Sequence, residues 1–306
     1  MSSTAQAIPD LVAAPPAEAV AALRRRPEFA QAMRISATGL VDLYEGGRLL
    51  DWLMDDRGRL VFGYIAFYLH FTRRQDDPTS GLTPTRMKEL CAELDVCSPG
   101  RVVAMLSLMR FAGYLAADHD VTDRRHRRLV ATDKLLGLLM QRWRLHFSAM
   151  APLFADGPDM LAALDDPAFV RGLMAAMFVR FHAGFRIVMY SPGIGLFGER
   201  NAGMMILTSL LISGEAGDLM PPTRPIPLSI SSLARRFSVS RPHVLKLMRD
   251  AAAAGLIERV GNDGAHVLLT PQLAVAAQNV FATMFLYFAD CAREALREMA
   301  AGRARM

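Results

Sequence analysis

Residues 227–270 read PLSISSLARRFSVSRPHVLKLMRDAAAAGLIERVGNDGAHVLLT, and they carry the clearest local signals in the chain. Apolar Ile230, Leu233 and Phe237 recur at helical spacing. After a short turn, Ser240 is placed to cap a second helix, because its hydroxyl can accept a hydrogen bond from the first helical turn. That helix ends at Gly255, in the position after a helix where glycine is favoured. The stretch therefore predicts two helices across a tight turn.

A β-hairpin follows the second helix. We expect its strands at 256–257 and 267–269, with the tip at 261–264. Thr270, followed by Pro271, then begins a long helix. The order helix, turn, helix, hairpin predicts a winged helix.

The same order of signals occurs earlier in the chain. Residues 98–115 align without a gap with residues 240–257, an offset of 142. The earlier hairpin has predicted strands at 114–115 and 129–130 and a tip at 123–127. Four positions of the aligned stretch are identical: Ser98 and Ser240, Val102 and Val244, Ala112 and Ala254, Gly113 and Gly255. The chain is therefore predicted to be an internal duplication.

Long apolar helices are expected on both sides of each unit. They are too apolar to stand alone in water, so we expect the helices of one half to pack on the other. The predicted fold is mainly α with small β-hairpin wings: two tandem winged helix-turn-helix units bracketed by long packing helices. The predicted divisions are a disordered Ala/Pro-rich tail (1–26), a first repeat (27–150), a linker (151–166) and a second repeat (167–306).

Composition excludes several classes of protein. The formal net charge of +5 permits a polyanionic partner, although the excess of Arg over Lys is also typical of a GC-rich genome. The three cysteines show no CxxC spacing, and no HExxH, P-loop or nucleophile motif is present. We therefore expect no metal, cofactor or catalytic site. With no signal peptide and only short apolar runs, the protein is expected to be cytoplasmic and without a membrane span.

The residues Val239-Ser240-Arg241-Pro242-His243-Val244 and 254–259, with their counterparts at 96–101 and 112–115, resemble the MarR family of bacterial transcriptional regulators. Members of that family are ordinarily homodimers of one such unit. The resemblance therefore implies that this chain is a monomeric pseudo-dimer that binds double-stranded DNA at the nucleoid, most simply as a repressor.

In such folds the second helix enters the major groove, and its amino-terminal residues meet base edges. In the second half, basic residues lie near the start or on one face of that helix, whereas the first half is less charged there and has a basic wing instead. The predicted DNA-binding residues are Ser98, Arg101, Arg124, Arg125, Arg127, Arg128, Ser240, Arg241, His243, Lys246 and Arg249. Solvated charges on a scaffold are the alternative interpretation.

Two aromatic groups at helical spacing could line a pocket for a small apolar or aromatic effector. They are Trp52, Tyr64, Phe67 and Tyr68, and Phe178, Phe181, His182 and Phe185. Core packing explains them equally well. Cys97 precedes a helix and could be a redox switch, although a structural role is the simpler interpretation.

Two other functions are compatible with tandem winged helices. One is a partner-binding subunit of a chromosome-organising complex, and the other is a plasmid-type replication initiator. A basic helix together with a basic wing favours DNA binding over the role of a partner-binding subunit. Salt-sensitive binding to DNA would distinguish a DNA-binding protein from such a subunit.

Overall fold

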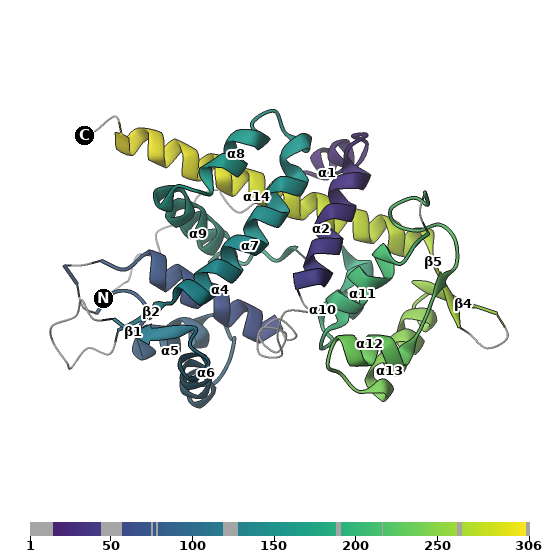
Figure 1. The fold of residues 1–306 in the computed structure, drawn as a ribbon, viewed down its shortest axis with the longest axis horizontal. Helices are drawn as coiled ribbons and strands as arrows, with labels where there is room; N and C mark the ends of the chain where they lie inside the picture. The colour runs from purple at the N-terminus through teal and green to yellow at the C-terminus, as the bar shows by residue number, and fades with distance from the viewer. Residues whose placement is uncertain are drawn as a thin grey trace, which may run out of the picture.

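The computed structural model describes residues 15–43, 57–74, 76–77, 79–118, 128–187, 191–215, 217–261 and 265–303. The protein is mainly helical with two small antiparallel sheets (Figure 1).

After α1, the elements of the first half run in the order expected from the sequence. They are α1 (Ala17–Arg24), α2 (Phe29–Leu43), α4 (Arg57–Phe71), α5 (Pro84–Glu93), α6 (Pro99–Phe111), β1 (Leu115–Ala117), β2 (Leu129–Ala131) and α7 (Asp133–Met150).

The second half repeats this order with additions. Its elements are η2 (Ala151–Leu153), α8 (Gly157–Ala163), α9 (Pro167–His182), η4 (Pro192–Ile194), α10 (Gly195–Gly198), α11 (Gly203–Ile212), β3 (Ile226–Pro227), α12 (Ile230–Arg236), α13 (Arg241–Ala253), β4 (Ile257–Val260), β5 (His266–Leu269) and α14 (Pro271–Arg303).

Two predicted divisions differ from the structure. Within the predicted tail, residues 17–24 form α1, which buries Leu23 and donates from Arg24 to Gln278 and Asn279 of α14. Residues 151–166, predicted as a linker, contain η2 and α8 and bury Leu153 and Met160 in the core. Both segments are too short to show a clear helical periodicity in the sequence, which is why these helices were not predicted. Contacts with other helices hold them in place.

The two hairpins have closely similar sheets. In the first, β1 pairs with β2 in antiparallel register, and an isolated bridge joins Leu82 to Leu129. In the second, the strand order is β3-β5-β4, with Ile226 opposite Val267. The third strand of the second sheet was not predicted, because two residues carry no alternation that a sequence pattern can detect.

The turn between the paired helices has the same geometry in both halves. Asp95 and Ser238 adopt left-handed φ values of 51° and 52°. The amide after each donates back to the first helix, from Val96 N to Cys91 O at 2.8 Å and from Val239 N to Ala234 O at 3.0 Å. Ser98 and Ser240 then cap α6 and α13 through their side chains, as predicted.

The far ends of α6 and α13 are also alike. Gly113 and Gly255 have φ values of 73° and 68°, which only glycine adopts without strain. Their carbonyls accept hydrogen bonds from the hydroxyls of Thr132 at 2.8 Å and Thr270 at 2.9 Å. The turns and the ends of the two helix pairs therefore have the same backbone geometry and the same hydrogen bonds.

The long helices of the two halves pack against each other in the centre of the molecule. α1 lies on α14, α2 on α11, and α4 on α9 (Figure 1). The Tyr68 ring of α4 stacks on the Phe178 ring of α9 at 3.7 Å between centroids. The expectation that the apolar helices of one half cover those of the other is confirmed.

Helix α14 is the one described helix that is long and apolar enough to cross a membrane. Helix α14 is longer than the apolar run predicted from the sequence in this region. Of its most apolar 18-residue stretch, 67% is buried inside the protein. Packing against α9 and α1 therefore accounts for its composition.

Candidate nucleic-acid interface

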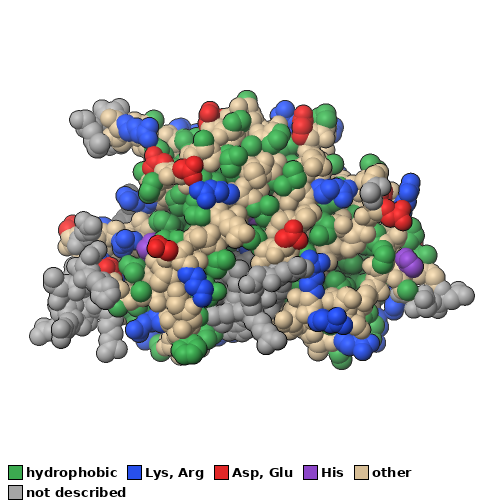
Figure 2. Space-filling model, viewed as in Figure 1, with side chains coloured by type: hydrophobic (Ala, Val, Ile, Leu, Met, Phe, Trp, Pro, Cys, Tyr) green, Lys and Arg blue, Asp and Glu red, His purple; other side chains and the backbone are tan. Residues whose placement is uncertain are grey.

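The outward face of α13 carries most of the predicted base-reading residues. Val244, Leu247 and Met248 point into the core, which leaves Arg241, Lys246 and Arg249 exposed on the other side. No acidic residue lies in the first turn of α13, so the partial positive charge of the helix amino end is not offset there. In Figure 2, Lys and Arg side chains gather over α12 and α13.

Neighbouring groups hold two of the predicted residues. The His243 imidazole donates through Nε2 to the carbonyl oxygen of Asn201 at 2.9 Å, in the tautomer that protonates this nitrogen. Lys246 lies 3.3 Å from the Asp250 carboxylate, which also pairs with Arg200 at 2.9 Å. His243 thus lies against the loop before α11 rather than at the centre of the outward face, and Lys246 keeps more than half of its side chain in solvent.

Two basic residues near α13 were not predicted from the sequence. Arg200 holds Asp250 and thereby anchors the loop against α13. Arg235, in the last turn of α12, is exposed and lies on the helix that packs against α13. Arg200 lies in the loop before α11, and Arg235 lies on α12. No spacing pattern in the sequence links either residue to α13, because the tertiary fold brings these elements together.

The first half presents a different surface at the corresponding positions. Ser98 caps α6, and Arg101 is exposed in its first turn. The wing residues Arg124, Arg125 and Arg127 lie outside the described residues. The described part of α6 therefore offers only Arg101 near its amino end for contact with bases.

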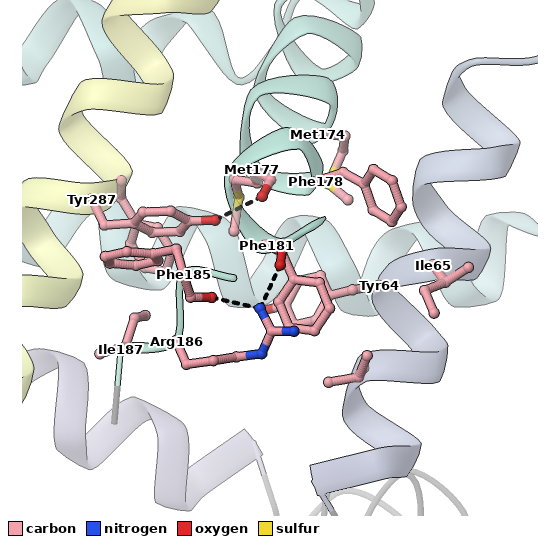
Figure 3. A pocket seen from close by; sticks show the side chains of 12 residues that line it. Tyr64, Ile65, Met174, Met177, Phe178, Phe181, Phe185, Arg186, Ile187 and Tyr287 are labelled. Atoms are coloured by element: carbon pink, nitrogen blue, oxygen red, sulfur yellow. Dashed lines mark hydrogen bonds between the residues drawn. The ribbon is translucent and has the colours of Figure 1, made fainter. Parts of the chain in front are cut away.

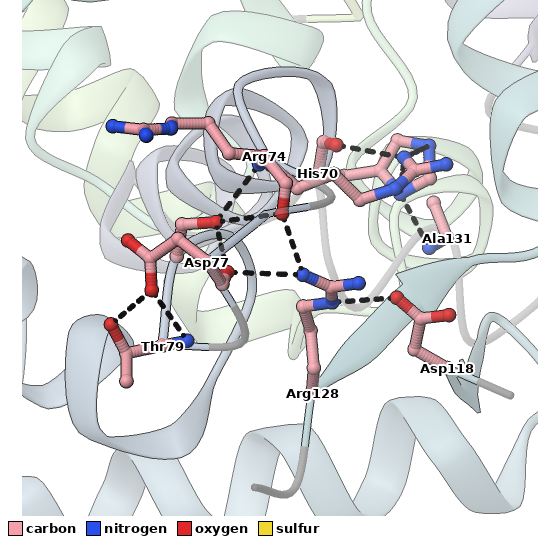
Figure 4. Close-up of polar contacts among 9 residues, drawn as sticks. His70, Arg74, Asp77, Thr79, Asp118, Arg128 and Ala131 are labelled. Carbon is pink, nitrogen blue, oxygen red and sulfur yellow. Dashed lines mark hydrogen bonds and ion pairs between the residues drawn. The ribbon is translucent and has the colours of Figure 1, made fainter. Parts of the chain in front are cut away.

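Arg128 does not have the exposed position that was expected of it. Its guanidinium lies in a buried ion pair, 2.6 Å from the Asp118 carboxylate, and both side chains are at most 5% exposed. It also donates to the carbonyl oxygens of Arg74 and Asp77 (Figure 4). Arg128 fastens the base of the hairpin to the loop before α5, so it is no longer a candidate for a phosphate contact.

His70 lies in the same region and is also buried. Its Nδ1 accepts a hydrogen bond from the backbone amide of Ala131 at 3.1 Å. Burial, aided by the charge of Arg73, lowers the pKa of His70 to about 4. The imidazole is therefore neutral near pH 7 and acts as a structural acceptor for strand β2.

The predicted effector residues meet in part around one cavity. Its volume is about 220 Å³, and it lies between α4, α9, the segment after α9, and α14 (Figure 3). Tyr64, Phe178, Phe181 and Phe185 line it, together with the unpredicted Arg186 and Tyr287. The elements that meet here come from both halves of the chain.

The other predicted effector residues lie elsewhere. Tyr68 stacks on the outer side of Phe178, and Phe67 is buried in the core outside the cavity lining. His182 pairs with Glu93 at 2.9 Å, which joins α9 to α5. Trp52 is outside the described residues.

Two polar groups of the cavity lining, those of Arg186 and Tyr287, form hydrogen bonds with backbone carbonyls. Arg186 donates to the carbonyls of Phe181 and Phe185, and its guanidinium lies 3.5 Å over the Phe181 ring. The Tyr287 hydroxyl donates to the Met177 carbonyl, and burial raises the pKa of Tyr287. The cavity is therefore apolar and aromatic, with one guanidinium at its wall.

The cysteines show no metal site. Among the described residues, no group of three His, Cys, Asp or Glu side chains could hold a metal ion. Cys97 is half-buried beside Cys91, whose pKa burial raises to about 12 with a further contribution from Cys97.

No protein-family model matches the chain, and neither a curated protein nor a solved structure matches it.

Proposed function

We propose that the protein is a sequence-specific, double-stranded-DNA-binding transcriptional regulator built from two tandem winged helix-turn-helix units. The observation that carries this proposal is the outward face of α13, a capped helix after a tight turn with Arg241, Lys246 and Arg249 exposed. Arginine and lysine donate to the acceptors of guanine in the major groove. A neighbouring basic side chain, Arg235, is available for phosphates.

Selection of bound sequences from a random duplex pool tests the proposal, followed by affinity measurements on the selected site. Arg249→Ala is expected to weaken binding by about 1–3 kcal/mol and to relax base preference. The control is Arg297→Ala, which removes the same charge from an exposed position of α14. Equal losses from both variants, or a pool without enrichment, would show that α13 does not read bases.

We further propose that the cavity between α4, α9 and α14 binds a small apolar or aromatic effector. The cavity walls come from both halves, so a bound molecule would change the packing between them and hence the placement of α13. Indole, titrated calorimetrically, is a suitable probe. Val61→Trp should fill the cavity and abolish binding, whereas Val179→Trp, on the exposed side of α9, should not. Binding of indole to both variants alike would contradict the assignment.

A further inference from the structure

The outward face of α6 exposes large apolar side chains, whereas that of α13 exposes basic ones. Phe111, at its carboxyl end, is 91% exposed, and Val103 is 45% exposed. At the positions where α13 has Pro242, Lys246, Arg249 and Ala253, α6 has Gly100, Ala104, Ser107 and Phe111. In Figure 2, hydrophobic side chains lie on the surface over α6, whereas Lys and Arg lie over α13. The two equivalent helices therefore suit different partners.

No packing or backbone conformation among the described residues requires glycine at position 100. A Cβ at this position would meet nothing within 4 Å, and its φ is not in the left-handed region. Phe111 likewise packs on little of its own chain. The two residues lie three helical turns apart on the same exposed face. A small residue and a large apolar residue on one open face form a hole and a knob.

An antiparallel pair of α6 helices would place the hole of each copy opposite the knob of the other. If two α6 helices pack antiparallel about the midpoint between Met105 and Leu106, Phe111 of each copy lies over Gly100 of the other. Ala104 of each then faces Ser107, and these small side chains let the helices approach closely. Such a surface matches itself, which is the requirement for an isologous contact.

We propose that the protein self-associates through α6, with the α6 helices of two copies packed antiparallel and Phe111 seated over Gly100. DNA fits this face less well, because bases meet the amino end of such a helix and Phe111 lies at the other end. The proposal does not depend on the proposed DNA binding.

The flanks of α6 determine the strength of this contact. Arg101 and Arg110 lie on either side of the apolar face, and α6 has no acidic residue. Two copies thus bring four guanidinium groups to the rim, so screening by salt should strengthen the association. One helix face per copy buries less than the roughly 1,600 Å² of a standard interface, so the dimer should be weak.

Sedimentation equilibrium of the full chain, without DNA, tests the proposal. At ~1 µM we expect the chain mass, and at ~100 µM a shift toward twice that mass that increases with salt. Phe111→Glu and Gly100→Leu should each abolish the shift and leave the melting temperature unchanged, since both positions are open to solvent. The matched control Val179→Glu, an exposed valine on α9, should retain it.

Disulfide cross-linking provides a test of the antiparallel register. In a Cys97→Ser background, chains with Gly100→Cys should cross-link to chains with Phe111→Cys, and neither variant should cross-link efficiently with itself. A constant chain mass at all concentrations would overturn the proposal. So would a Phe111→Glu variant that loses DNA affinity without any change in mass, because α6 would then be a DNA contact.

Discussion

At the scale of single residues, the buried pair of Arg128 and Asp118 is the most consequential polar contact. Arg128→Ala would leave the Asp118 carboxylate in a site where it is only 5% exposed, without its charge partner. Removing one member of a buried pair typically costs about 3–5 kcal/mol. We expect a loss of at least about 3 kcal/mol in the free energy of unfolding, measured by urea denaturation.

Arg110→Ala is the matched control for this prediction, because Arg110 is exposed on α6. Its stability should stay close to that of the parent protein. If Arg128→Ala were equally harmless, the pair would not hold the hairpin to the loop before α5.

Two buried histidines contribute to the response of the protein to acid. Burial lowers the pKa of His70 to about 4 and that of His146 to about 3. Both values are below the unfolded-state pKa of ~6.5, so the unfolded chain takes up protons first as the pH falls. Their contribution to stability is complete above pH ~6.5 and is lost progressively below it, down to the folded-state values.

The two histidines together should lower the free energy of unfolding by as much as about 2.7 kcal/mol per pH unit between pH ~5.5 and ~4.5. Proton NMR of the imidazole rings in the folded protein provides the direct measurement. We expect neither ring to titrate above pH ~5. A midpoint near pH 6.5 for either ring would mean that the ring is solvated and contributes nothing to this slope.

At the scale of elements, the proposed DNA binding and the divergence of α6 and α13 together predict an asymmetric DNA site. A homodimer imposes a palindrome because its reading helices are identical. Here Lys246 and Arg249 on α13 correspond to Ala104 and Ser107 on α6. At low protein concentration, selected sequences should contain one strongly preferred block, with weaker preference about one helical turn away.

The check on this prediction is the information content of the selected sequences. A perfect palindrome with equal information in both halves would contradict it. Alanine substitution provides a second check, since Arg249→Ala should weaken the preferred block whereas Ser107→Ala should leave it unchanged.

At the scale of the whole molecule, the interleaved helices predict that neither half is stable alone. α1 packs on α14 and α4 on α9, so each half would expose a large apolar surface without the other. The full chain should unfold in one transition, detected alike by far-UV circular dichroism and tryptophan fluorescence. Residues 167–303 expressed alone should show no cooperative melt, and co-expression with residues 1–166 should restore it. Two separate transitions in the full chain would show that the halves are independent domains.

The sequence by itself determined the paired helices, their caps and the hairpins. These features depend on local chemistry: Ser98 and Ser240 cap helices through bonds to amides three residues away, and Gly113 and Gly255 supply a left-handed turn. Residue type and spacing are sufficient to predict such short-range interactions.

Only the tertiary structure decided which charges are available to a partner. Arg128 belongs to a run of arginines in the sequence, but Asp118 and two carbonyls from the loop before α5 enclose it. His243 lies at a position predicted from the sequence to contact bases, but its imidazole is bonded to the Asn201 carbonyl. Helices α1 and α8 likewise form where contacts with other helices bury Leu23 and Met160. The partners in these cases lie 10 to more than 250 residues away in the sequence. Local periodicity reports which face of a helix is apolar, but it contains no information about which distant group will lie against that face.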